Sequence, residues 1–445
     1  MLRVNSKKVL PGDTFLALKG KEKDGHDFIE EAIDKGAACI IASHGEYDVK
    51  TIMVPDTRTY LSNYLRELHL EAFKKIKIIG IIGTYGKTST GSILHQMLNK
   101  LNSKTAYLGT LGFYINEKKE QTKETTPDLY EIYEYINRAM EEECENIIIE
   151  LSSGAIKKRH LEGLRFDLAI YTGMITQGKT EEEIKEYLNT KIETFKMLNK
   201  DGIAIINIDD AYHEYFILPQ NTNITYGKND SNYKLSSISL NYDKTYLKIN
   251  DDNLEIPFIG SPNTYNFLAA YSTVLSMGFN KNEVISLIDK LSQIDGRYQG
   301  IKHEESLIII DYAFTPELID KVIKTTNEFK KGKVIILIGA GGDRRKEERP
   351  IIGKITTQNA DHVIFTTDNP RYEEPESIID EMVKGAEKEN YEIIVNRKEA
   401  IKQAVKMLEG NDILLILGKG DEDSQIIGND LFPLKDITEV KKYVK

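Results

Sequence analysis

The sequence predicts an α/β protein in which a small N-terminal α/β unit precedes two larger units, each built on a parallel sheet. Short runs rich in Ile and Leu alternate with longer segments of helical apolar spacing through most of the chain. The length of 445 residues allows two to four domains that each bury a core. We place the predicted domains at residues 1–70, 71–298 and 299–445.

The first 70 residues are predicted to form a small α/β domain. Residues 14–18 and 38–42 have the apolar character of strands. Residues 28–35 have helical spacing, and the helix should stop at Gly36, because glycine commonly follows the last turn of a helix.

The central region is predicted to hold a parallel sheet with helices on both faces. Its apolar runs alternate with helical segments, which is typical of this architecture, and they cover residues 76–82, 147–151, 168–171 and 203–208. Residues 229–255 alternate apolar with polar positions and are rich in Tyr and Asn, which predicts an antiparallel meander.

The last region begins a second series of the same kind. We expect a doubly wound, Rossmann-like unit that starts just after Gly296-Arg297. Its predicted strands are residues 307–311, 334–339, 362–366, 393–395 and 413–417.

The composition favours a cytoplasmic protein without a nucleic-acid or membrane partner. The net charge of −11 argues against a general nucleic-acid binder, which needs a basic face. We find no run of 18 apolar residues and no apolar core of a signal peptide near the N-terminus. Cys39 and Cys144 lie in or beside apolar segments, where cysteine acts as a small hydrophobic residue in a reducing compartment. We expect a monomer.

A glycine loop between a predicted strand and a predicted helix is the most informative motif. Residues 80–89 read Gly-Ile-Ile-Gly-Thr-Tyr-Gly-Lys-Thr-Ser. In this context backbone N–H groups and a helix N-terminus can hold phosphate, Lys87 can neutralise it, and Thr88 can offer its hydroxyl to Mg²⁺. The usual spacing has glycine where this chain has Ile81, so a chance glycine loop is the alternative. We predict ATP and Mg²⁺ as cofactors, with Gly83, Thr84, Gly86, Lys87, Thr88 and Ser89 at the nucleotide.

Motifs in three regions resemble those of the Mur ligases, most of all the branch that adds the third amino acid to UDP-N-acetylmuramoyl-dipeptide. Residues 5–13 and 19–28 are similar to that branch's uridine-nucleotide domain, with Ser6 as a substrate contact. The family has Asp-Ser-Arg where this chain has Asn5-Ser6-Lys7. The resemblance spans nearly the whole chain and implies a three-domain fold with a central P-loop ATPase domain.

In the central region, the phosphate loop matches the family's Gly-Thr-x-Gly-Lys-Thr form. The resemblance implies that Thr125, Thr126, Ser153 and Arg159 contact the muramoyl-peptide. It also implies that Glu150, which ends an apolar run, binds Mg²⁺ and acts in catalysis with Lys87. The alternative for Glu150 is a solvated glutamate at a strand end.

Residues 187–195 match the family's Tyr-x-x-x-Lys-x-x-x-Phe segment. The resemblance implies that Lys191 is carbamylated, so that a cation becomes a metal-binding carboxylate with a catalytic role. A lysine on the surface of a helix is the alternative, because spacing alone does not distinguish the two. The resemblance further places Asn266, Arg297 and Asp311 at the nucleotide, with Asn266 at the adenine.

Three segments of the last region resemble those of the family's amino-acid site. They contain Arg344 in residues 341–350, the Asp368-Asn369-Pro370-Arg371 form that accompanies meso-diaminopimelate, and Gly418 and Glu422 in Gly-Lys-Gly-Asp-Glu. Arginine suits a carboxylate ligand because its fork donates two parallel hydrogen bonds. An Asn-Pro turn with a solvated Arg371 is one alternative, and Lys419 as a solvated loop charge is another.

Four places depart from the family's pattern, and each lacks a family histidine. They are Gly154, residues 173–179, Phe314 and Asp421. Losing histidine and aspartate from residues 173–179 should weaken a second Mg²⁺ site. The departures indicate either altered chemistry or a partly degenerate site.

The sequence therefore predicts an ATP-dependent amide ligase that activates a carboxylate as an acyl phosphate and joins it to an amino acid. The first interpretation is the addition of meso-diaminopimelate to UDP-MurNAc-dipeptide in peptidoglycan synthesis. A ligase of the same family acting on another carboxylate, in nickel-tetrapyrrole or natural-product synthesis, is the second. The third is a nucleotide-binding paralogue without turnover.

Overall fold

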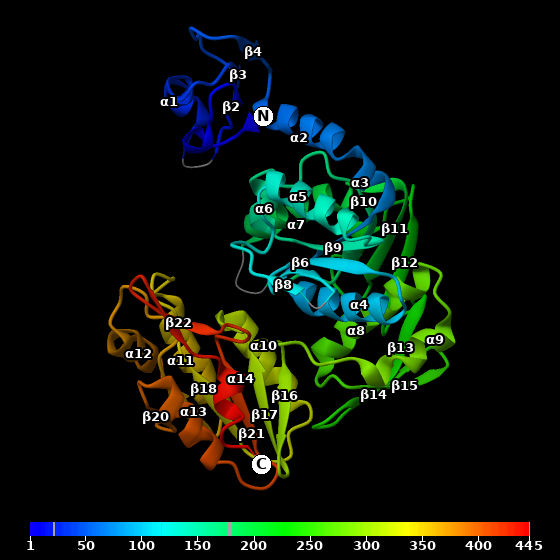
Figure 1. The fold of residues 1–445 in the computed structure, drawn as a ribbon. Helices are drawn as coiled ribbons and strands as arrows, with labels where there is room; N and C mark the ends of the chain where they lie inside the picture. The colour runs from blue at the N-terminus through cyan, green and yellow to red at the C-terminus, as the bar shows by residue number, and fades with distance from the viewer. Residues whose placement is uncertain (21–22, 117, 177–179, 445) are drawn as a thin grey trace.

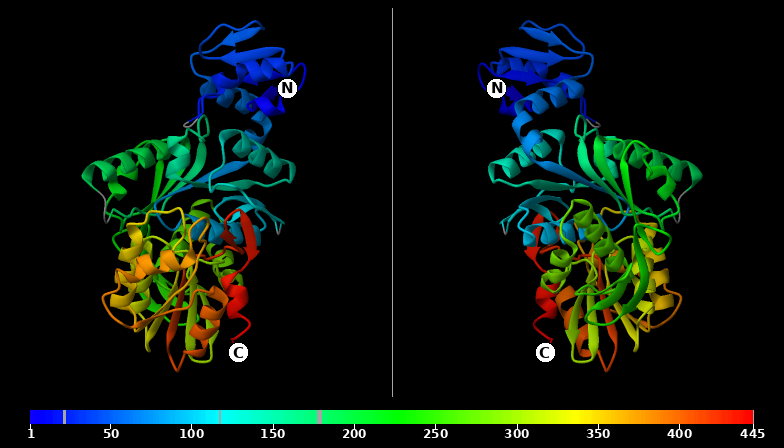
Figure 2. Two further views of the ribbon diagram at one scale, coloured as in Figure 1. Left: turned by 90° about the vertical axis from the view of Figure 1, so that its left-hand side faces the viewer. Right: turned by 90° about the vertical axis from the view of Figure 1, so that its right-hand side faces the viewer.

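The computed structural model describes residues 1–20, 23–116, 118–176 and 180–444. The chain forms a curved molecule, with the N-terminal unit at one end, the large central sheet in the middle and the third unit at the other end (Figure 1). The two further views show the same order, with the two termini at opposite ends of the molecule (Figure 2). Within the described ranges, no helix combines the length and apolar character needed to cross a bilayer.

The N-terminal unit is a four-stranded parallel sheet in the order β1-β2-β3-β4. Its strands are β1 (Leu2–Arg3), β2 (Thr14–Leu16), β3 (Cys39–Ala42) and β4 (Thr51–Met53). A 3₁₀ turn over Gly25–Phe28 and helix α1 (Ile29–Asp34) fill the position of the predicted helix, and a small apolar cluster around Phe15 and Ile40 forms the core. Helices α2 (Thr57–Leu68) and α3 (Leu70–Lys75) lead into the central sheet.

The central sheet has eleven strands in the order β15-β14-β13-β12-β11-β10-β5-β9-β6-β7-β8. The six strands from β12 to β6 in this order are parallel: β12 (Thr222–Gly227), β11 (Leu198–Asn207), β10 (Phe166–Tyr171), β5 (Lys77–Ile82), β9 (Asn146–Leu151) and β6 (Thr105–Gly109). One edge carries β7 (Gly112–Ile115) and β8 (Lys118–Glu120). The other edge carries the predicted antiparallel meander: β13 (Tyr233–Leu240), β14 (Thr245–Ile249) and β15 (Asp252–Ile256).

Helices cover both faces of this sheet, as the alternation of strands and helices predicts. One apolar cluster packs α3, α5 and α7 against the sheet, and a second packs α4, α8 and α9 against the opposite face. The helices are α4 (Lys87–Lys100), α5 (Leu129–Glu141), α6 (Ser153–Lys157), α7 (Glu181–Phe195), α8 (Ser261–Ser276) and α9 (Lys281–Ser286).

The third unit is a six-stranded sheet in the order β16-β17-β21-β18-β19-β20, in which β16 is antiparallel to β17 and the other pairs are parallel. Its strands are β16 (Gln299–His303), β17 (Ser306–Asp311), β18 (Val334–Ile338), β19 (His362–Phe365), β20 (Tyr391–Ile393) and β21 (Ile413–Leu417). Separate apolar clusters line its two faces, with α10, α11 and α12 on one and α13 and α14 on the other. The helices are α10 (Pro316–Asn327), α11 (Glu348–Asn359), α12 (Pro375–Val383), α13 (Arg397–Lys406) and α14 (Asp436–Val440), and a hairpin of β22 (Ser424–Ile427) and β23 (Asp430–Pro433) completes the unit.

The motif residues lie at the carboxyl ends of parallel strands. The phosphate loop follows β5, Glu150 lies near the end of β9, and Asp311 ends β17. Parallel strands present their carboxyl ends at one edge, which is where ligands bind in open α/β sheets. The topology therefore gathers residues that are distant in the sequence.

Candidate active site

The phosphate loop is held by close contacts that leave no space for side chains at its glycines. Gly86 has a φ of 79° and caps the N-terminus of α4. A Cβ atom on Gly86 would lie 2.6 Å from Asn266 Oδ1, and one on Gly83 would lie 2.0 Å from Thr172 Oγ1. Ile81, at the position where the usual motif has glycine, lies inside β5 and is buried. The first glycine of the loop is therefore Gly83, two residues later than the usual spacing implies.

Two lysines approach this loop and share one acceptor. Lys87 Nζ donates to the carbonyl oxygen of Gly83 at 3.0 Å, and Lys191 Nζ donates to the same oxygen at 3.1 Å. Lys191 also contacts Ser153 Oγ at 3.3 Å and lies 4.4 Å from the centre of the Tyr187 ring. Its side chain is fully buried, so the surface-lysine alternative is wrong. Burial lowers the pKa of Lys191 to about 8, and the nearby Lys87 charge acts in the same direction.

Glu150 is a buried carboxylate beside the loop, which excludes the alternative of a solvated glutamate. Its Oε2 accepts hydrogen bonds from Thr88 Oγ1 at 3.0 Å and from Thr110 Oγ1 at 3.1 Å. Its Oε1 accepts from the Tyr107 hydroxyl and, at 3.2 Å, from the Thr110 amide. A carboxylate and two threonine hydroxyls are hard oxygen ligands, so this group fits Mg²⁺.

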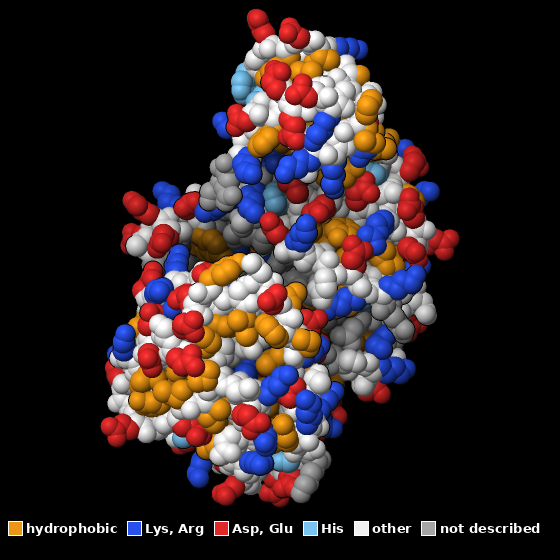
Figure 3. All heavy atoms as spheres, turned by 60° about the vertical axis from the view of Figure 1, so that its left-hand side comes forward, with side chains coloured by type: hydrophobic (Ala, Val, Ile, Leu, Met, Phe, Trp, Pro, Cys, Tyr) orange, Lys and Arg blue, Asp and Glu red, His pale blue; other side chains and the backbone are white. Residues whose placement is uncertain are grey.

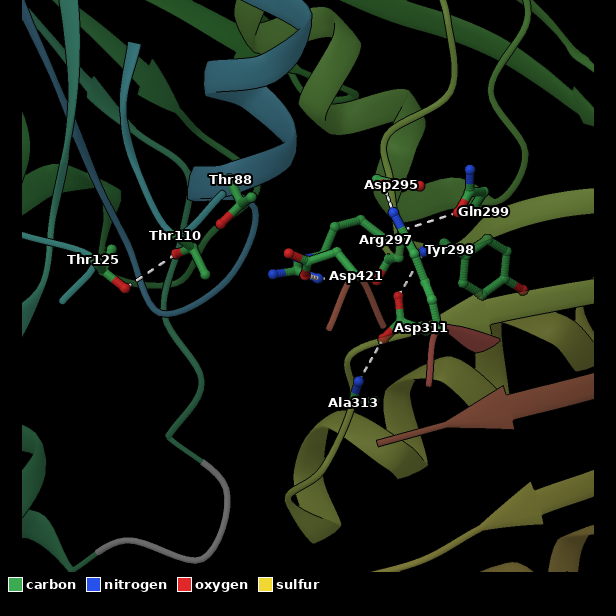
Figure 4. Close-up of polar contacts among 12 residues, drawn as sticks. Thr88, Thr110, Thr125, Asp295, Arg297, Tyr298, Gln299, Asp311, Ala313 and Asp421 are labelled. Carbon is green, nitrogen blue, oxygen red and sulfur yellow. Dashed lines mark hydrogen bonds and ion pairs between the residues drawn. The ribbon is translucent and has the colours of Figure 1, made fainter. Parts of the chain in front are cut away.

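The two threonines predicted to contact substrate have different surroundings. Thr125 Oγ1 lies 3.1 Å from Thr110 Oγ1, at the wall of the pocket described below (Figure 4). Thr126 is buried: its hydroxyl donates to the Glu150 carbonyl at 2.7 Å and accepts from the Ser152 amide at 2.9 Å. Thr126 thus fixes the turn after β9.

A cavity of about 480 Å³ lies between the phosphate loop and the third unit. The central sheet's side contributes the loop and the start of α8, where Asn266 Nδ2 donates to Asn263 Oδ1 at 3.1 Å. The segment that joins the two units contributes residues 297–298, and the third unit contributes residues 311–314 and one face of α10. The predicted nucleotide residues Thr84, Gly86, Lys87, Thr88, Ser89, Asn266, Arg297 and Asp311 all line this cavity.

Arg297 and Asp311 lie together on the third-unit side of the cavity (Figure 4). Asp311 accepts hydrogen bonds from the Tyr298 amide at 2.6 Å and the Ala313 amide at 2.8 Å. Burial raises the pKa of Asp311, and the Arg297 charge opposes this rise. Arg297 Nη1 donates to Asp421 Oδ1 at 2.7 Å.

The predicted amino-acid site contains two arginines side by side. A Cβ atom on Gly341 would lie 3.1 Å from both Arg344 Nε and Arg371 Nη1. Arg371 Nη1 donates to the carbonyl oxygen of Gly342, and Arg344 lies 4.1 Å from the centre of the Phe314 ring. Among the described residues, no carboxylate forms an ion pair with either arginine.

Glu422 provides the negative charge in the predicted amino-acid site, opposite in sign to Arg344 and Arg371. Its Oε2 accepts hydrogen bonds from Lys419 Nζ at 2.8 Å and Asn369 Nδ2 at 2.7 Å. Lys419 is fully buried, so the solvated-charge alternative is wrong. Asp368 is also buried, and a Cβ atom on Gly418 would lie 2.6 Å from its Oδ2. Asp368 and Gly418 therefore pack closely against each other at this site, where a side chain at position 418 would not fit.

Of the predicted substrate residues, only Thr125 lines the cavity, and Ser6 and Arg159 are bound to other parts of the chain. Ser6 is buried in the N-terminal unit, where its hydroxyl donates to Glu31 at 2.7 Å. Arg159 has a φ of 60° and pairs with Asp56 at 2.7 Å and with Glu162 at 2.5 Å. The Arg159 guanidinium lowers the pKa of Asp56 to about 2. These pairs join the start of α2 to the central unit.

The departures from the family pattern have distinct environments. A Cβ atom on Gly154 would meet nothing within 4 Å, so this position is open. Gly173 accepts from the Thr84 amide at 2.9 Å, so the segment after β10 supports the phosphate loop. Residues 177–179 of that segment lie outside the described residues. Phe314 and Asp421 contact the two arginines Arg344 and Arg297.

Sequence reasoning missed Tyr107 and Thr110, which hold Glu150, and Lys321, whose Nζ lies 3.0 Å from the centre of the Tyr85 ring. The first two belong to β6 and its end, a strand that the apolar pattern did not predict. Lys321 lies on α10 in another unit, and no motif signals that it approaches the phosphate loop.

Comparison with known proteins assigns all three regions to one family. Residues 1–70 match the "Mur ligase family, catalytic domain", residues 81–274 the "Mur ligase middle domain", and residues 296–420 the "Mur ligase, glutamate ligase domain". The chain is 33% identical to the UDP-N-acetylmuramoyl-L-alanyl-D-glutamate–2,6-diaminopimelate ligase of Bacillus cereus over 459 residues, which covers 100% of this chain and 93% of the relative. A ligase of the same name from Clostridium acetobutylicum is also 33% identical and covers 100% and 94%.

Solved structures show the same fold. A UDP-N-acetylmuramoyl-L-alanyl-D-glutamate–2,6-diaminopimelate ligase aligns with a TM-score of 0.72 and 27% identity, over 99% of this chain and 94% of that chain. The MurF ligase of Thermotoga maritima in complex with ADP aligns with a TM-score of 0.63 and 20% identity, over 94% of both chains. The chain belongs to the Mur ligase family, the ATP-dependent acid–amino acid ligases of peptidoglycan synthesis.

Proposed function

We propose that the protein joins meso-diaminopimelate to the free carboxylate of UDP-MurNAc-dipeptide, with ATP as the source of energy. The observation that carries this proposal is the pair Arg344 and Arg371, two guanidinium groups side by side without a carboxylate partner among the described residues. Arginine binds a carboxylate through two parallel hydrogen bonds. Glu422 accepts both of its described side-chain bonds through Oε2, which leaves Oε1 for the distal ammonium of the amino acid.

The division of labour follows the three units. Residues 1–70 would hold the uridine nucleotide, residues 71–298 the ATP and the acceptor carboxylate, and residues 299–445 the amino acid. Figure 3 shows Lys and Arg side chains, with Asp and Glu side chains among them, where the N-terminal unit meets the rest beside a hollow in the surface. Thr125 lines the cavity that the acceptor's carboxylate would reach.

The nucleotide residues place the triphosphate against this carboxylate. Lys87 and the loop amides would bind the β- and γ-phosphates, and Asn266, Arg297 and Asp311 would hold the nucleoside side. Thr88 and Glu150 would hold Mg²⁺, which when bound neutralises charge on the phosphate oxygens.

The reaction then proceeds in two displacements. A carboxylate oxygen of the acceptor attacks the γ-phosphorus, and the bond from this phosphorus to the β-phosphate oxygen breaks. ADP is the leaving group, and the acceptor becomes an acyl phosphate. The neutral amine of the amino acid attacks the acyl carbon, forms the amide bond, and displaces inorganic phosphate, while the amine proton passes to solvent. The Lys87 ammonium stabilises the charge that develops on the transferred phosphoryl group.

Lys191 has the surroundings that carbamylation requires. The neutral amine is the form that adds CO₂, and burial with a pKa lowered to about 8 makes that form accessible. A carbamate here would give Ser153 and the phosphate loop an anionic neighbour in place of a second cation.

A second candidate is a ligase of this family with another acceptor carboxylate. The observation that favours it is Arg159, whose guanidinium is already neutralised by Asp56 and Glu162. The open position at Gly154 also lacks the family's histidine side chain.

One assay distinguishes these candidates. ADP release is measured with UDP-MurNAc-dipeptide and a panel of amino acids, and the product is identified by its mass. We expect release only when both meso-diaminopimelate and the dipeptide are present, with a product heavier by one diaminopimelyl residue. ADP release that requires a different carboxylate would support the second candidate. Nucleotide binding without turnover across the panel would contradict both.

A further inference from the structure

The nucleotide cavity and the amino-acid site meet at one loop, residues 418–424. This loop touches the segment that joins the central and third units. A Cβ atom on Gly296 would lie 2.1 Å from the Asp421 amide nitrogen, and one on Gly420 would lie 2.8 Å from the Gly296 carbonyl oxygen. The two glycines therefore face each other without room for a side chain, and any shift of the loop must move this joining segment.

Asp421 connects the loop to the nucleotide cavity. Its Oδ1 accepts from Arg297 Nη1 at 2.7 Å, and the two side chains are only 16% and 12% exposed. Arg297 also lies 4.6 Å from the centre of the Tyr312 ring. Figure 4 shows the Arg297 side chain extending toward the side of the cavity that carries Thr88 and Thr110. Asp421 thus fixes where this guanidinium meets a bound nucleotide.

The next residue faces the other site. Glu422 is held by Lys419 and Asn369, and Lys419 also donates to the Ser424 carbonyl at 2.7 Å. One buried ammonium near the start of this short loop is therefore hydrogen-bonded to residues near its end, which braces the loop. Asp421 and Glu422 are consecutive carboxylates of one braced segment. Asp421 faces the nucleotide cavity, and Glu422 faces the predicted amino-acid site.

A second connection runs parallel to the loop through stacked side chains. Arg297 lies over Tyr312, Tyr312 packs edge-on against Phe314 at 5.2 Å between ring centres, and Arg344 lies 4.1 Å from the Phe314 ring centre. This row begins at an arginine of the nucleotide cavity and ends at an arginine of the amino-acid site. Cation–π contacts of this kind stabilise defined positions of both arginines.

We propose that Asp421 is a positioning residue that couples the two sites: it orients Arg297 for the nucleotide and ties it to the Glu422 loop, so that bound amino acid and bound nucleotide strengthen each other. The inference rests on the proposed function for the identity of the amino acid. Coupling between sites is reciprocal, so each ligand must change the affinity of the other by one factor.

The test measures binding of ADP with MgCl₂ by calorimetry, with and without saturating meso-diaminopimelate. In the wild-type protein we expect meso-diaminopimelate to tighten ADP binding by at least about fivefold. Asp421→Asn should weaken the binding of ADP without amino acid by about five- to tenfold, because the freed Arg297 side chain must be ordered again when ADP binds. The same substitution should reduce the coupling factor to about one. Asp423→Asn is the matched control, because Asp423 is exposed and its side chain bonds no described residue; both values should stay at wild-type levels.

Unchanged ADP affinity and coupling in Asp421→Asn would overturn the proposal. Tighter ADP binding would also overturn it, because Asp421 would then act only by repelling phosphate. Phe314→Leu should lower the coupling factor, and thermal melts of each variant check folding. If the panel assay identifies another amino acid, the proposed function fails. The affinity of Asp421→Asn for ADP still decides the role of Asp421. The coupling factor is then measured with that other amino acid.

Discussion

At the scale of single residues, the two lysines at the Gly83 carbonyl oxygen have different chemistry. Both ammonium groups share this acceptor, but Lys191 is fully buried whereas Lys87 lines the cavity. A buried cation without an anionic partner is unfavourable, and the protein responds by lowering the pKa of Lys191 to about 8. The proposed roles differ accordingly: Lys87 would bind phosphate, and Lys191 would react as an amine.

Replacing Lys87 by alanine should remove ATP turnover while the fold persists. We expect kcat to fall by about 10²–10³-fold, because a positioned charge at the transferred phosphoryl group is lost. Lys100→Ala, at the exposed far end of the same helix, is the control and should retain wild-type kcat. Substrate-dependent ADP release by Lys87→Ala at the wild-type rate would contradict the assigned role.

Carbamylation of Lys191 should depend on pH in a definite direction. The neutral fraction of this amine grows as the pH rises through its pKa of about 8, so a carbamate should form more readily at pH 8.5 than at pH 7. NMR of protein equilibrated with ¹³C-bicarbonate should show a carbamate signal that Lys191→Met lacks. Identical spectra of the two proteins would exclude a carbamate at this position.

The same shift affects stability. Between pH 8 and the ordinary lysine pKa of 10.5, the unfolded state binds more protons than the folded state. The free energy of unfolding should therefore rise with pH in this window, and Lys191→Met should remove that part of the slope. Urea titrations at several pH values measure it, and an unchanged slope in the variant would show that Lys191 titrates normally.

At the scale of elements, a buried ion pair fixes α14 against α13. Arg397 Nε and Nη2 donate to the two oxygens of Asp436 at 2.8 and 2.6 Å, and both side chains are fully buried. Arg397 Nη2 also donates to the Leu417 carbonyl at 3.0 Å, just before the Gly418 loop. The pair therefore anchors the last helix beside the predicted amino-acid site.

Asp436→Asn should destabilise the third unit by about 3–5 kcal/mol, because it leaves a buried guanidinium without its counter-charge. Glu399→Gln on α13 breaks an exposed pair with Lys402 and should cost much less, because solvent screens this pair. Hydrogen exchange of α13 and β21 under rising urea measures both. Equal costs for the two variants would mean that burial of the Arg397 pair contributes little.

Sequence patterns predicted elements where periodicity is strong and missed those that depend on neighbours. The Ile-rich strands β5, β9, β17, β18 and β21 appear where predicted, because buried parallel strands are nearly continuous apolar runs. β6 and β12 were missed, since their sequences Thr-Ala-Tyr-Leu-Gly and Thr-Asn-Ile-Thr-Tyr-Gly mix polar and small residues. Strand formation there is decided by pairing with β9 and β11, which no local pattern encodes.

At the scale of the whole molecule, the central and third units contact each other across the nucleotide cavity. Lys321 of α10 lies 3.0 Å from the centre of the Tyr85 ring in the phosphate loop. Burial lowers the pKa of Lys321 to about 8, and the negative charge of Asp210 opposes that shift. This contact joins the predicted phosphate loop to the unit that carries the predicted amino-acid site.

Tyr85→Ala should loosen this contact, whereas Tyr85→Phe keeps the ring and should preserve it. A cation–π contact contributes about 0.5–2 kcal/mol, so the opening equilibrium of α10 should rise by about two- to thirtyfold in the alanine variant. Hydrogen exchange of residues 316–327 reports this opening. Exchange that is equally fast in both variants would assign the effect to the hydroxyl group rather than to the ring.

The sequence by itself determined the α/β class, most strands of the two larger units, the phosphate loop and the family of the chain, because these depend on local periodicity and on short motifs. Only the tertiary structure decided that Glu150, Lys191 and Lys419 are buried, that Tyr107 and Thr110 hold Glu150, and that Asp421 pairs with Arg297. The physical reason is that burial and pairing arise where distant segments meet. A residue's neighbours across a sheet or between units set its charge state, and the order of residues along the chain does not specify them.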